Sequence, residues 1–353
     1  MVLNEKILQE LEKSTVISPC VTYWDKKSVF EGDYQLISGI NPRIVEALNQ
    51  IGINKFYSHQ AESITSLRER NNIVIVTGTS SGKSLCYQIP IFEKFIETGT
   101  STALLLFPTK ALTYDQLHAI KRIEDSIFSI IAISAVYDGD TPAGLRQNIR
   151  KNGRILLTNP DMLNIAFLPH HTNWATFFQN LKFVVIDELH QYRGVFGSHF
   201  CNIIRRLKRI LDFYGSNPQF ILTSATIGNP KELAEKIIEK PVILVNNDSS
   251  PKGERNTILY NPPFVNRDLG IREGLLKSTI KLSSFFLSRN IQTIVFCGSR
   301  RFVELTVREM RQKFPNRNSE IRGYRSGYLK HERREIENGM KNRSISMVAA
   351  TNA

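Results

Sequence analysis

The sequence predicts an α/β protein with two domains, each built on a parallel sheet that helices cover on both faces. Short apolar runs rich in β-branched residues alternate with helical stretches between residues 55 and 245, and the alternation resumes after residue 269. The intervening stretch contains turn-forming residues and two adjacent prolines, which is typical of a linker. We therefore predict a helical and irregular lead-in (1–54), a first domain (55–245), a linker (246–268) and a second domain (269–353).

Each predicted element rests on a local pattern. Ile7, Leu8 and Leu11 lie at helical spacing, and Asn41-Pro42 opens another helix because proline suits the first helical turn. In the first domain we predict strands at 73–77, 103–107, 131–136, 154–158, 182–187, 219–223 and 241–245, and helices at 110–123, 142–150, 197–213 and 229–239. In the second domain we predict helices at 270–288, 300–313 and 330–340, and strands at 292–296 and 345–350.

The composition indicates a polyanionic partner. The 353 residues carry a formal net charge of +13 at pH 7, which suits binding to nucleic acid, although charge that only keeps a protein soluble gives the same balance. The four cysteines form no C-x-x-C pair, so we expect reduced thiols in a cytoplasmic protein. No apolar run is long enough to cross a bilayer, and the N-terminus lacks the apolar segment of a signal peptide. We therefore expect no membrane partner.

A glycine-rich loop lies between the first strand of the first domain and the helix that follows. Residues 78–84 read GTSSGKS and match the phosphate-binding pattern G-x-x-x-x-G-K-[ST] at every fixed position. The N–H groups of such a loop and the dipole of the next helix favour bound phosphate, so we predict an ATP site with Mg²⁺. Lys83 is expected to reach the β- and γ-phosphates, and Ser84 to hold the ion. The predicted contacts of this phosphate loop are Gly78, Thr79, Ser80, Ser81, Gly82, Lys83 and Ser84.

Two acids end another apolar strand. In the stretch from Phe183 to His190, Asp187 stands where P-loop enzymes place a carboxylate on Mg²⁺. Glu188 is predicted to act as general base toward the attacking water, and His190 to sense the γ-phosphate. A strand that ends in Asp-Glu is by itself often only a pair of loop carboxylates. Its pairing with the phosphate loop favours the catalytic interpretation.

Two further motifs extend the predicted nucleotide site. Gln60 has an amide that can pair with the donor and acceptor edges of adenine, and Tyr57 is placed to stack on the ring. The bland alternative for this stretch is a polar helix start. Ser224, Ala225 and Thr226 follow a predicted strand, at the sheet edge where open α/β sheets bind their ligands.

The order of these motifs resembles superfamily 2 helicases of the DEAD/DEAH-box kind. GTSSGKS, PTKAL, TNPDM, DELH and SAT follow one another along the chain. The resemblance is closer still to the bacterial mitomycin-repair helicases and their RecQ-like fungal relatives, through stretches such as YDGDT, LPHH, YRGVFGSH and RGYRSGY. It covers about residues 55–353.

This resemblance implies two RecA-like domains with ATP between them, and an ATP-dependent DNA helicase or translocase with a role in DNA repair. It also implies a coupling role for Ser224-Ala225-Thr226, and side chains that contact the phosphate backbone of a single strand. Only the subgroup favours DNA over RNA, so an RNA helicase stays open. We expect a monomer. We also expect no zinc, because no cysteine or acid cluster accompanies His170-His171. The residues that match the strand-contact motifs are Pro108, Thr109, Lys110, Thr158, Asn159, Ser299, Arg300 and Thr351.

The sequence also departs from the family pattern. The fifth motif begins at Thr351-Asn352-Ala353, and the sixth motif, whose arginines reach the γ-phosphate in this family, is not found. We therefore expect an incomplete second RecA-like domain, very slow ATP hydrolysis and no duplex unwinding by this polypeptide. The alternative is a nucleotide-gated nucleic-acid-binding fragment without helicase activity. A GTPase is disfavoured, because the chain has Gln60 and lacks an N-K-x-D tetrapeptide.

Overall fold

The computed structural model describes residues 2–128 and 133–351, and the chain forms two compact units. The larger unit is Val29–Gly253, and the smaller unit combines Met1–Ser28 with Glu254–Ala353. This division differs from the predicted segments at two places. The predicted lead-in is shared between the units, and part of the predicted linker belongs to the smaller unit.

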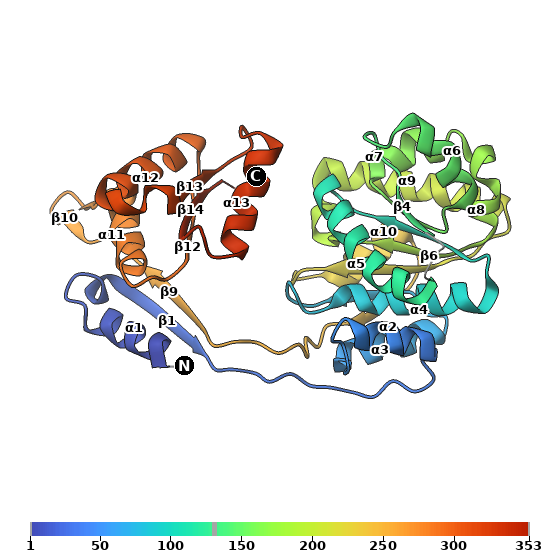
Figure 1. Cartoon of the computed structure of the whole chain (residues 1–353), viewed down its shortest axis with the longest axis horizontal. Helices are drawn as coiled ribbons and strands as arrows, with labels where there is room; N and C mark the ends of the chain where they lie inside the picture. The colour runs from blue at the N-terminus through green and yellow to red at the C-terminus, as the bar shows by residue number, and fades with distance from the viewer. Residues whose placement is uncertain (1, 129–132, 352–353) are drawn as a thin grey trace. The chain divides into compact units, whose positions relative to one another are not determined.

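The larger unit is built on one parallel sheet of seven strands in the order β4-β5-β3-β6-β7-β2-β8 (Figure 1). The prediction of a parallel α/β sheet is confirmed, and every strand predicted here overlaps an observed one. Residues 131 and 132, the first two residues of the predicted strand 131–136, lie outside the residues that the structure describes. The strands are β2 (Ile73–Val76), β3 (Thr102–Leu106), β4 (Ser134–Val136), β5 (Ile155–Thr158), β6 (Leu181–Ile186), β7 (Gln219–Ser224) and β8 (Ile243–Val245).

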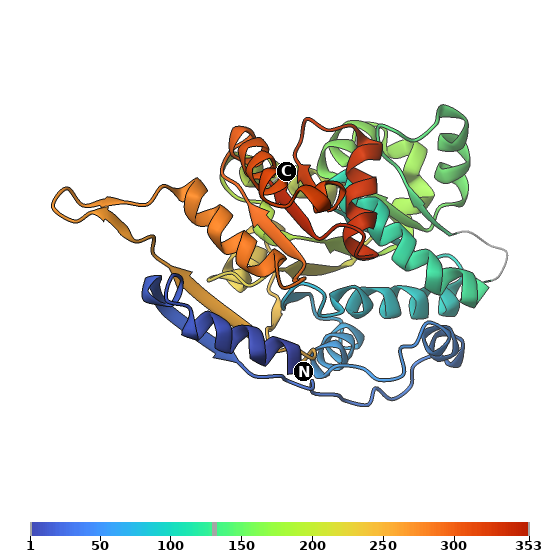
Figure 2. The ribbon, with the colours of Figure 1, turned by 60° about the vertical axis from the view of Figure 1, so that its left-hand side comes forward.

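Helices cover both faces of this sheet (Figure 2). Successive residues of β2 point to opposite faces, so Ile73 and Ile75 join one apolar core while Val74 and Val76 join the other. Across the described part of the chain, no helix is long and apolar enough to cross a membrane. The helices of the larger unit are α2 (Pro42–Gln50), α3 (Ser58–Arg68), α4 (Lys83–Thr98), α5 (Lys110–Phe128), α6 (Ala143–Asn152), α7 (Pro160–Met162), α8 (Ala175–Gln179), α9 (Gly194–Phe213) and α10 (Pro230–Ile238).

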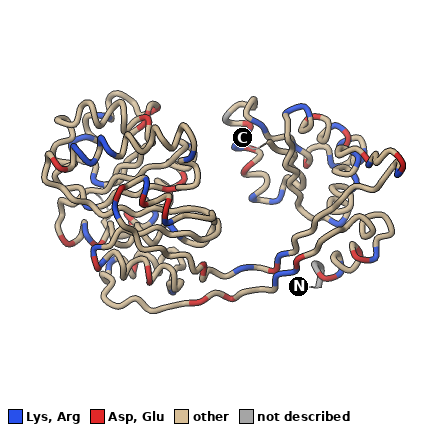
Figure 3. The backbone as a smooth tube through the Cα atoms, turned by 180° about the vertical axis from the view of Figure 1, so that it is seen from behind, with Lys and Arg blue, Asp and Glu red and all other residues tan. Residues whose placement is uncertain are grey.

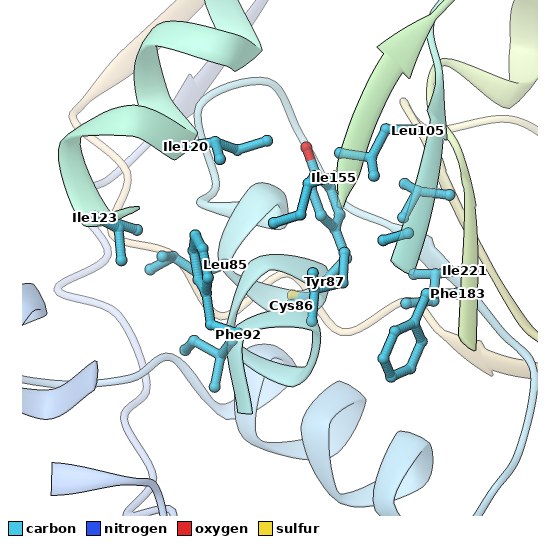
Figure 4. Close-up of a cluster of buried hydrophobic side chains, with 14 of the residues drawn as sticks. Leu85, Cys86, Tyr87, Phe92, Leu105, Ile120, Ile123, Ile155, Phe183 and Ile221 are labelled. Carbon is cyan, nitrogen blue, oxygen red and sulfur yellow. The ribbon is translucent and has the colours of Figure 1, made fainter. Parts of the chain in front are cut away.

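The packing of α4 positions the phosphate loop at its N-terminus. Figure 4 shows Tyr87 and Phe92 of α4 in the apolar core with Ile120 of α5 and Leu105 of β3. Tyr87 and Phe92 are almost fully buried. Burying one such side chain contributes about 1.5–3 kcal/mol, so several of them fix the helix against the sheet. The start of α4 is thereby held at the carboxyl end of β2.

The smaller unit contains a second parallel sheet, with the strand order β12-β14-β13. The strand β13 was not predicted, because Arg322 and Gly323 interrupt its apolar run. The prediction of a helix from residue 270 is wrong at its start: Ile271–Arg272 is strand β11, and the helix begins after Gly274. The strands are β10 (Phe264–Asn266), β11, β12 (Thr293–Phe296), β13 (Ile321–Tyr324) and β14 (Met347–Ala350), and the helices are α1 (Val2–Lys13), α11 (Leu275–Leu287), α12 (Arg300–Lys313) and α13 (Lys330–Lys341).

An antiparallel ribbon joins distant parts of the sequence within the smaller unit (Figure 1). In this ribbon β1 (Val21–Lys27) pairs with β9 (Arg255–Tyr260). Trp24 Nε1 donates a hydrogen bond to Asn256 Oδ1 at 2.8 Å. This pairing explains why residues 1–28 belong to the smaller unit, and why residues 255–260 form a strand where we expected only a linker.

Candidate nucleotide and nucleic-acid site

The phosphate loop joins β2 to α4 in a conformation that requires glycine. Gly82 has a φ of +78° and directly precedes Lys83, the first residue of α4. A Cβ on Gly82 would lie 2.5 Å from Gln60 Nε2, so a larger residue would strain the backbone and displace the Gln60 amide. Ser81 Oγ donates to Gly78 O at 2.9 Å and stabilises the loop from within. Exposed at its tip are Thr79 and Ser80.

The Lys83 ammonium is held against the backbone of its own loop. Its Nζ donates to Thr77 O at 2.9 Å and to Gly78 O at 2.7 Å. Burial lowers the pKa of Lys83, and the charges of Glu188 and then Asp187 oppose that shift. The fold therefore brings the ammonium within electrostatic range of Glu188, the predicted general base, and of Asp187, the predicted Mg²⁺ ligand.

Ser84, the predicted Mg²⁺ ligand, lies in the first turn of α4. Its hydroxyl donates to Gln116 Oε1 on α5 at 3.0 Å, and Tyr87 OH donates to the same oxygen at 3.0 Å. A hydroxyl oxygen keeps its lone pairs when it donates, so Ser84 Oγ can still bind a cation. Gln116 belongs to no sequence motif that we singled out, and only the structure identifies it as a neighbour of the loop.

The two acids at the end of β6 are held by their surroundings. Asp187 Oδ1 accepts a hydrogen bond from Glu188 N at 3.0 Å and another from the Thr223 hydroxyl on β7. Burial raises the pKa of Asp187, and the Thr223 bond opposes it. Glu188 has a left-handed backbone with φ of +54°; burial and then the charge of Asp187 raise its pKa. His190 Nδ1 lies 3.2 Å from Glu188 Oε2. Paired acids with raised pKa values are typical of functional sites.

A cavity of about 450 Å³ lies beside the phosphate loop. Gln60 faces it, and its Oε1 accepts from Tyr57 N at 2.9 Å while its Nε2 donates to Gly82 O at 3.0 Å. An amide can make further hydrogen bonds at both ends, so Gln60 can still pair with a base. The rings of Tyr34 and Tyr57 lie 5.3 Å apart on the cavity wall. The volume and lining suit a small aromatic ligand.

The motif Ser224-Ala225-Thr226 starts at the last residue of β7. Ser224 is fully buried, and its Oγ has no hydrogen-bond partner among the residues that the structure describes. Thr226 is exposed. The contact with the acid site comes instead from Thr223, one residue earlier. A strand-end hydroxyl beside a strand-end acid is a signal that sequence could give only with the strand order known.

The first group of residues predicted to contact single-stranded nucleic acid lies between β3 and the first turn of α5. Pro108 and Thr109 precede α5, and Thr109 Oγ1 accepts a hydrogen bond from Leu112 N at 3.4 Å. Lys110 Nζ lies 2.9 Å from Asp140 Oδ2, and both side chains are about half exposed. An exposed pair of this kind is weak, so a phosphate can replace Asp140 as the partner of Lys110.

The second group lies at the end of β5, the neighbour of β3, so both groups share one edge of the sheet. Thr158 is fully buried, and its hydroxyl donates to Tyr137 O at 2.6 Å. In this arrangement the hydroxyl is engaged inside the protein, and the contact of Thr158 with a phosphate stays a prediction. Asn159 Oδ1 accepts a hydrogen bond from Met162 N at 2.9 Å and caps α7.

In the smaller unit the residues predicted to contact single-stranded nucleic acid also lie at one edge of the sheet. Ser299 and Arg300 follow β12, and Thr351 follows β14, which is the neighbouring strand. Ser299 Oγ accepts a hydrogen bond from Phe302 N at 3.2 Å and caps α12. The other two residues of the expected fifth motif, Asn352 and Ala353, lie outside the described residues.

Positive charge is spread over both units (Figure 3). Lysine and arginine residues lie along several helices and loops of each unit, with acids between them. Among residues 2–128 and 133–351, no group of three or more His, Cys, Asp or Glu side chains is arranged to hold a metal ion. A cation at the phosphate loop would therefore depend on phosphate oxygens together with Ser84 and Asp187.

A phosphate loop at the end of one parallel strand, with an acid pair at the end of another, is the arrangement of P-loop proteins. The DEAD/DEAH box helicase family model matches residues 57–233, and the chain belongs to this family. Over 99% of its length the chain is 48% identical to "Uncharacterized ATP-dependent helicase YprA" of Bacillus subtilis, and 36% identical to "ATP-dependent helicase HRQ1" of Saccharomyces cerevisiae.

Solved structures show the same fold. The DUF1998 helicase MrfA bound to DNA has a TM-score of 0.92 and 45% identity, over 99% of this chain and 46% of that one. MrfA bound to DNA and AMPPNP also has a TM-score of 0.92, with 44% identity over 99% of this chain and 48% of that one. The chain spans less than half the length of the curated relatives named above, 47% of the first and 33% of the second.

Proposed function

We propose that this chain is the ATP-binding and strand-binding part of an ATP-dependent DNA helicase or translocase that acts in DNA repair in the cytoplasm. The observation that carries the proposal is the grouping of Lys83, Asp187 and Glu188 at the carboxyl edge of one sheet. A cation beside two acids is the arrangement needed to hold the charged phosphates of Mg·ATP and to activate a water molecule.

Different residues of the larger unit bind the adenine, the phosphates and Mg²⁺ and activate the water molecule. Gln60 and Tyr57 hold the adenine, and Lys83 with the N–H groups of the phosphate loop holds the phosphates. Ser84 and Asp187 would hold Mg²⁺, which neutralises phosphate charge when bound. Glu188 takes the proton of the attacking water, and its raised pKa brings it closer to that of an effective base at neutral pH. His190, whose Nδ1 lies 3.2 Å from Glu188 Oε2, senses the γ-phosphate.

Single-stranded DNA is the proposed second ligand. Lys110 is the strongest single contact, because its charge lies at the surface and its present partner is an exposed carboxylate. Asn159, Ser299, Arg300 and Thr351 follow strands at sheet edges in the two units. DNA rather than RNA is supported by the relatives: two solved MrfA structures contain DNA, and Hel308 of Pyrococcus horikoshii is named an ATP-dependent DNA helicase.

Titration with a fluorescent ATP analogue tests the nucleotide site. The parent chain is expected to bind the analogue with Mg²⁺, and Lys83→Ala to abolish binding because the phosphates lose their charged partner. Gln60→Ala is expected to lower the preference for ATP over GTP. Equal affinity in the parent and Lys83→Ala would contradict the assignment of the phosphate site. Equal ATP and GTP affinity in the parent would contradict the role given to Gln60.

A further inference from the structure

A carboxylate from outside the sheet binds the first residue of the phosphate loop. Asp248 follows β8, shortly before the chain leaves the larger unit, and its Oδ2 accepts a hydrogen bond from Gly78 N at 3.0 Å. A Cβ on Gly78 would lie 3.1 Å from the same oxygen, so the two groups are in close contact. The Asp248 side chain is only 16% exposed. An acid is thus packed against a loop whose expected ligand is also an anion.

The next residue makes a second connection, to α3. Ser249 is almost completely buried, and its Oγ accepts a hydrogen bond from His59 N at 2.9 Å and lies 2.9 Å from His59 Nδ1. His59 is also fully buried and lies beside the backbone of Ser81 in the phosphate loop. Burial lowers the pKa of His59, which keeps the imidazole neutral. His59 therefore stands between the loop on one side and Ser249 on the other.

Asp248 is held in its charged form. Ser250 Oγ donates to Asp248 Oδ1 at 2.6 Å, and Lys252 Nζ lies 3.3 Å from Oδ2. Partial burial opposes ionisation, but the hydrogen bonds from Ser250 and Gly78 outweigh it and lower the pKa of Asp248 to about 2. Its charge also acts on the Lys83 ammonium, the proposed partner of the phosphates. A bound triphosphate would therefore share one loop N–H donor, Gly78 N, and the Lys83 cation with this carboxylate.

Residues 248–253 also form backbone hydrogen bonds with residues 29–33, the other segment at a boundary of the larger unit. Phe30 and Lys252 exchange two backbone hydrogen bonds, at 2.9 and 2.7 Å, and Asp33 N donates to Ser249 O at 2.9 Å. The chain passes between the units after Ser28 and after Gly253, so residues 29–33 and 248–253 are the segments of the larger unit that adjoin the two crossings. Both crossing segments are thus attached, through Asp248 and Ser249, to the phosphate loop and to α3, which contains His59 and Gln60.

We propose that Asp248 is a positioning residue that ties the two crossing segments to the phosphate loop, and that nucleotide phosphate loosens this tie by repelling its carboxylate. The proposal rests on the proposed function, because it takes the loop as the site of ATP. Since ATP carries more negative charge than ADP, it repels Asp248 more strongly. The crossing segments therefore respond to which nucleotide occupies the loop, and Ser249 and His59 carry the same response to α3.

Two variants separate charge from shape. Asp248→Asn keeps an oxygen that accepts from Gly78 N and removes the charge, so we expect affinity for the ATP analogue to rise at least threefold and affinity for the ADP analogue to rise less. Asp248→Ala removes the charge together with the acceptor, so it should also favour the ATP analogue over the ADP analogue, but with lower affinity for both than Asp248→Asn because Gly78 N loses its partner. Asp268→Asn, an exposed acid in the smaller unit, is the matched control and should leave both affinities unchanged.

Amide hydrogen exchange, followed by mass spectrometry on the full chain, measures how firmly residues 246–253 are held against the phosphate loop and α3. Exchange in residues 246–253 should be faster with the ATP analogue than without it in the parent, and this difference should fall at least twofold in Asp248→Asn. Binding that depends on Lys83 but leaves exchange in 246–253 unchanged would overturn the inference and leave the proposed function intact. Equal losses of ATP and ADP affinity in Asp248→Asn would also overturn it, since a purely structural role predicts that result. Absence of any Lys83-dependent binding would instead refute the proposed function.

Discussion

The hydroxyl of Thr223 donates a hydrogen bond to Oδ1 of Asp187. Thr223 lies near the end of β7 and Asp187 directly after β6, so the bond links neighbouring strands at the edge where we place Mg·ATP. Ser224-Ala225-Thr226 begins one residue later. The proposed metal ligand is therefore connected to the motif for which we predict a coupling role through one side chain.

Thr223→Val should weaken the Mg²⁺ site and the fold together. The substitution keeps the side-chain shape but removes the donor to a buried carboxylate, and a hydrogen bond to a charged group contributes about 1.5–3 kcal/mol. We expect a loss of stability of that size and a higher Mg²⁺ concentration at half-maximal ATP hydrolysis. Denaturant unfolding and a Mg²⁺ titration measure the two effects. Thr223→Ser, which retains the hydroxyl, is the control; a valine variant equal to the parent would show that the bond is unimportant.

The rate of ATP hydrolysis should rise with pH as Glu188 loses its proton. Burial and the charge of Asp187 raise the pKa of Glu188, and a general base acts only when ionised. The acid limb of the pH–rate profile should therefore lie above the ordinary pKa of a glutamate. Glu188→Gln should abolish hydrolysis while leaving binding of the ATP analogue intact. An acid limb at the ordinary glutamate pKa would argue against this assignment.

Glu124 should be important for stability rather than for catalysis. This fully buried side chain on α5 accepts hydrogen bonds from Ile133 N and Ser134 N, both at 3.0 Å. Glu124→Ala leaves two buried N–H groups unsatisfied, at about 1–3 kcal/mol each, and should lower the denaturation midpoint markedly. Glu124→Gln, which keeps one oxygen acceptor, should cost less.

The same carboxyl predicts a pH dependence of stability. Burial raises the pKa of Glu124, so the folded chain binds this proton more tightly than the unfolded chain does. The free energy of unfolding should thus lose this contribution as pH rises through the folded-state pKa. Denaturant unfolding at a series of pH values should show a smaller decline for Glu124→Gln than for the parent; equal declines would contradict the prediction.

Binding of single-stranded DNA should depend steeply on salt, because phosphate contacts release counterions. Lys110→Ala should reduce the slope of log affinity against log salt by about one unit. Fluorescence anisotropy with an oligonucleotide at several salt concentrations gives this slope. Lys277, an exposed lysine outside the predicted contacts, provides the control substitution to alanine. A slope reduced equally by both substitutions would indicate diffuse charge rather than a contact at Lys110.

Local sequence patterns predicted the parallel sheets and the phosphate loop because each depends on nearby residues. Lys83 and Asp187 lie within short motifs whose neighbouring strands are apolar and easily recognised. The sequence could not give the pairing of β1 with β9, since strand partners far apart leave no periodic signal. Thr223 and Asp248 were missed for a related reason: neither forms a motif, and each acts only because the fold brings it to a residue far away in the chain.

The pairing of β1 with β9 also sets an order of events during synthesis. Trp24 and Asn256 are separated by 232 residues, and the whole larger unit lies between them. At roughly 5–20 residues per second, β1 leaves the ribosome on the order of 10–50 s before its partner exists. The larger unit can therefore fold first. During this time β1 has no partner strand, and its unpaired edge can pair with another chain. A gene fragment that starts after residue 28 would leave β9 with this same exposed edge permanently.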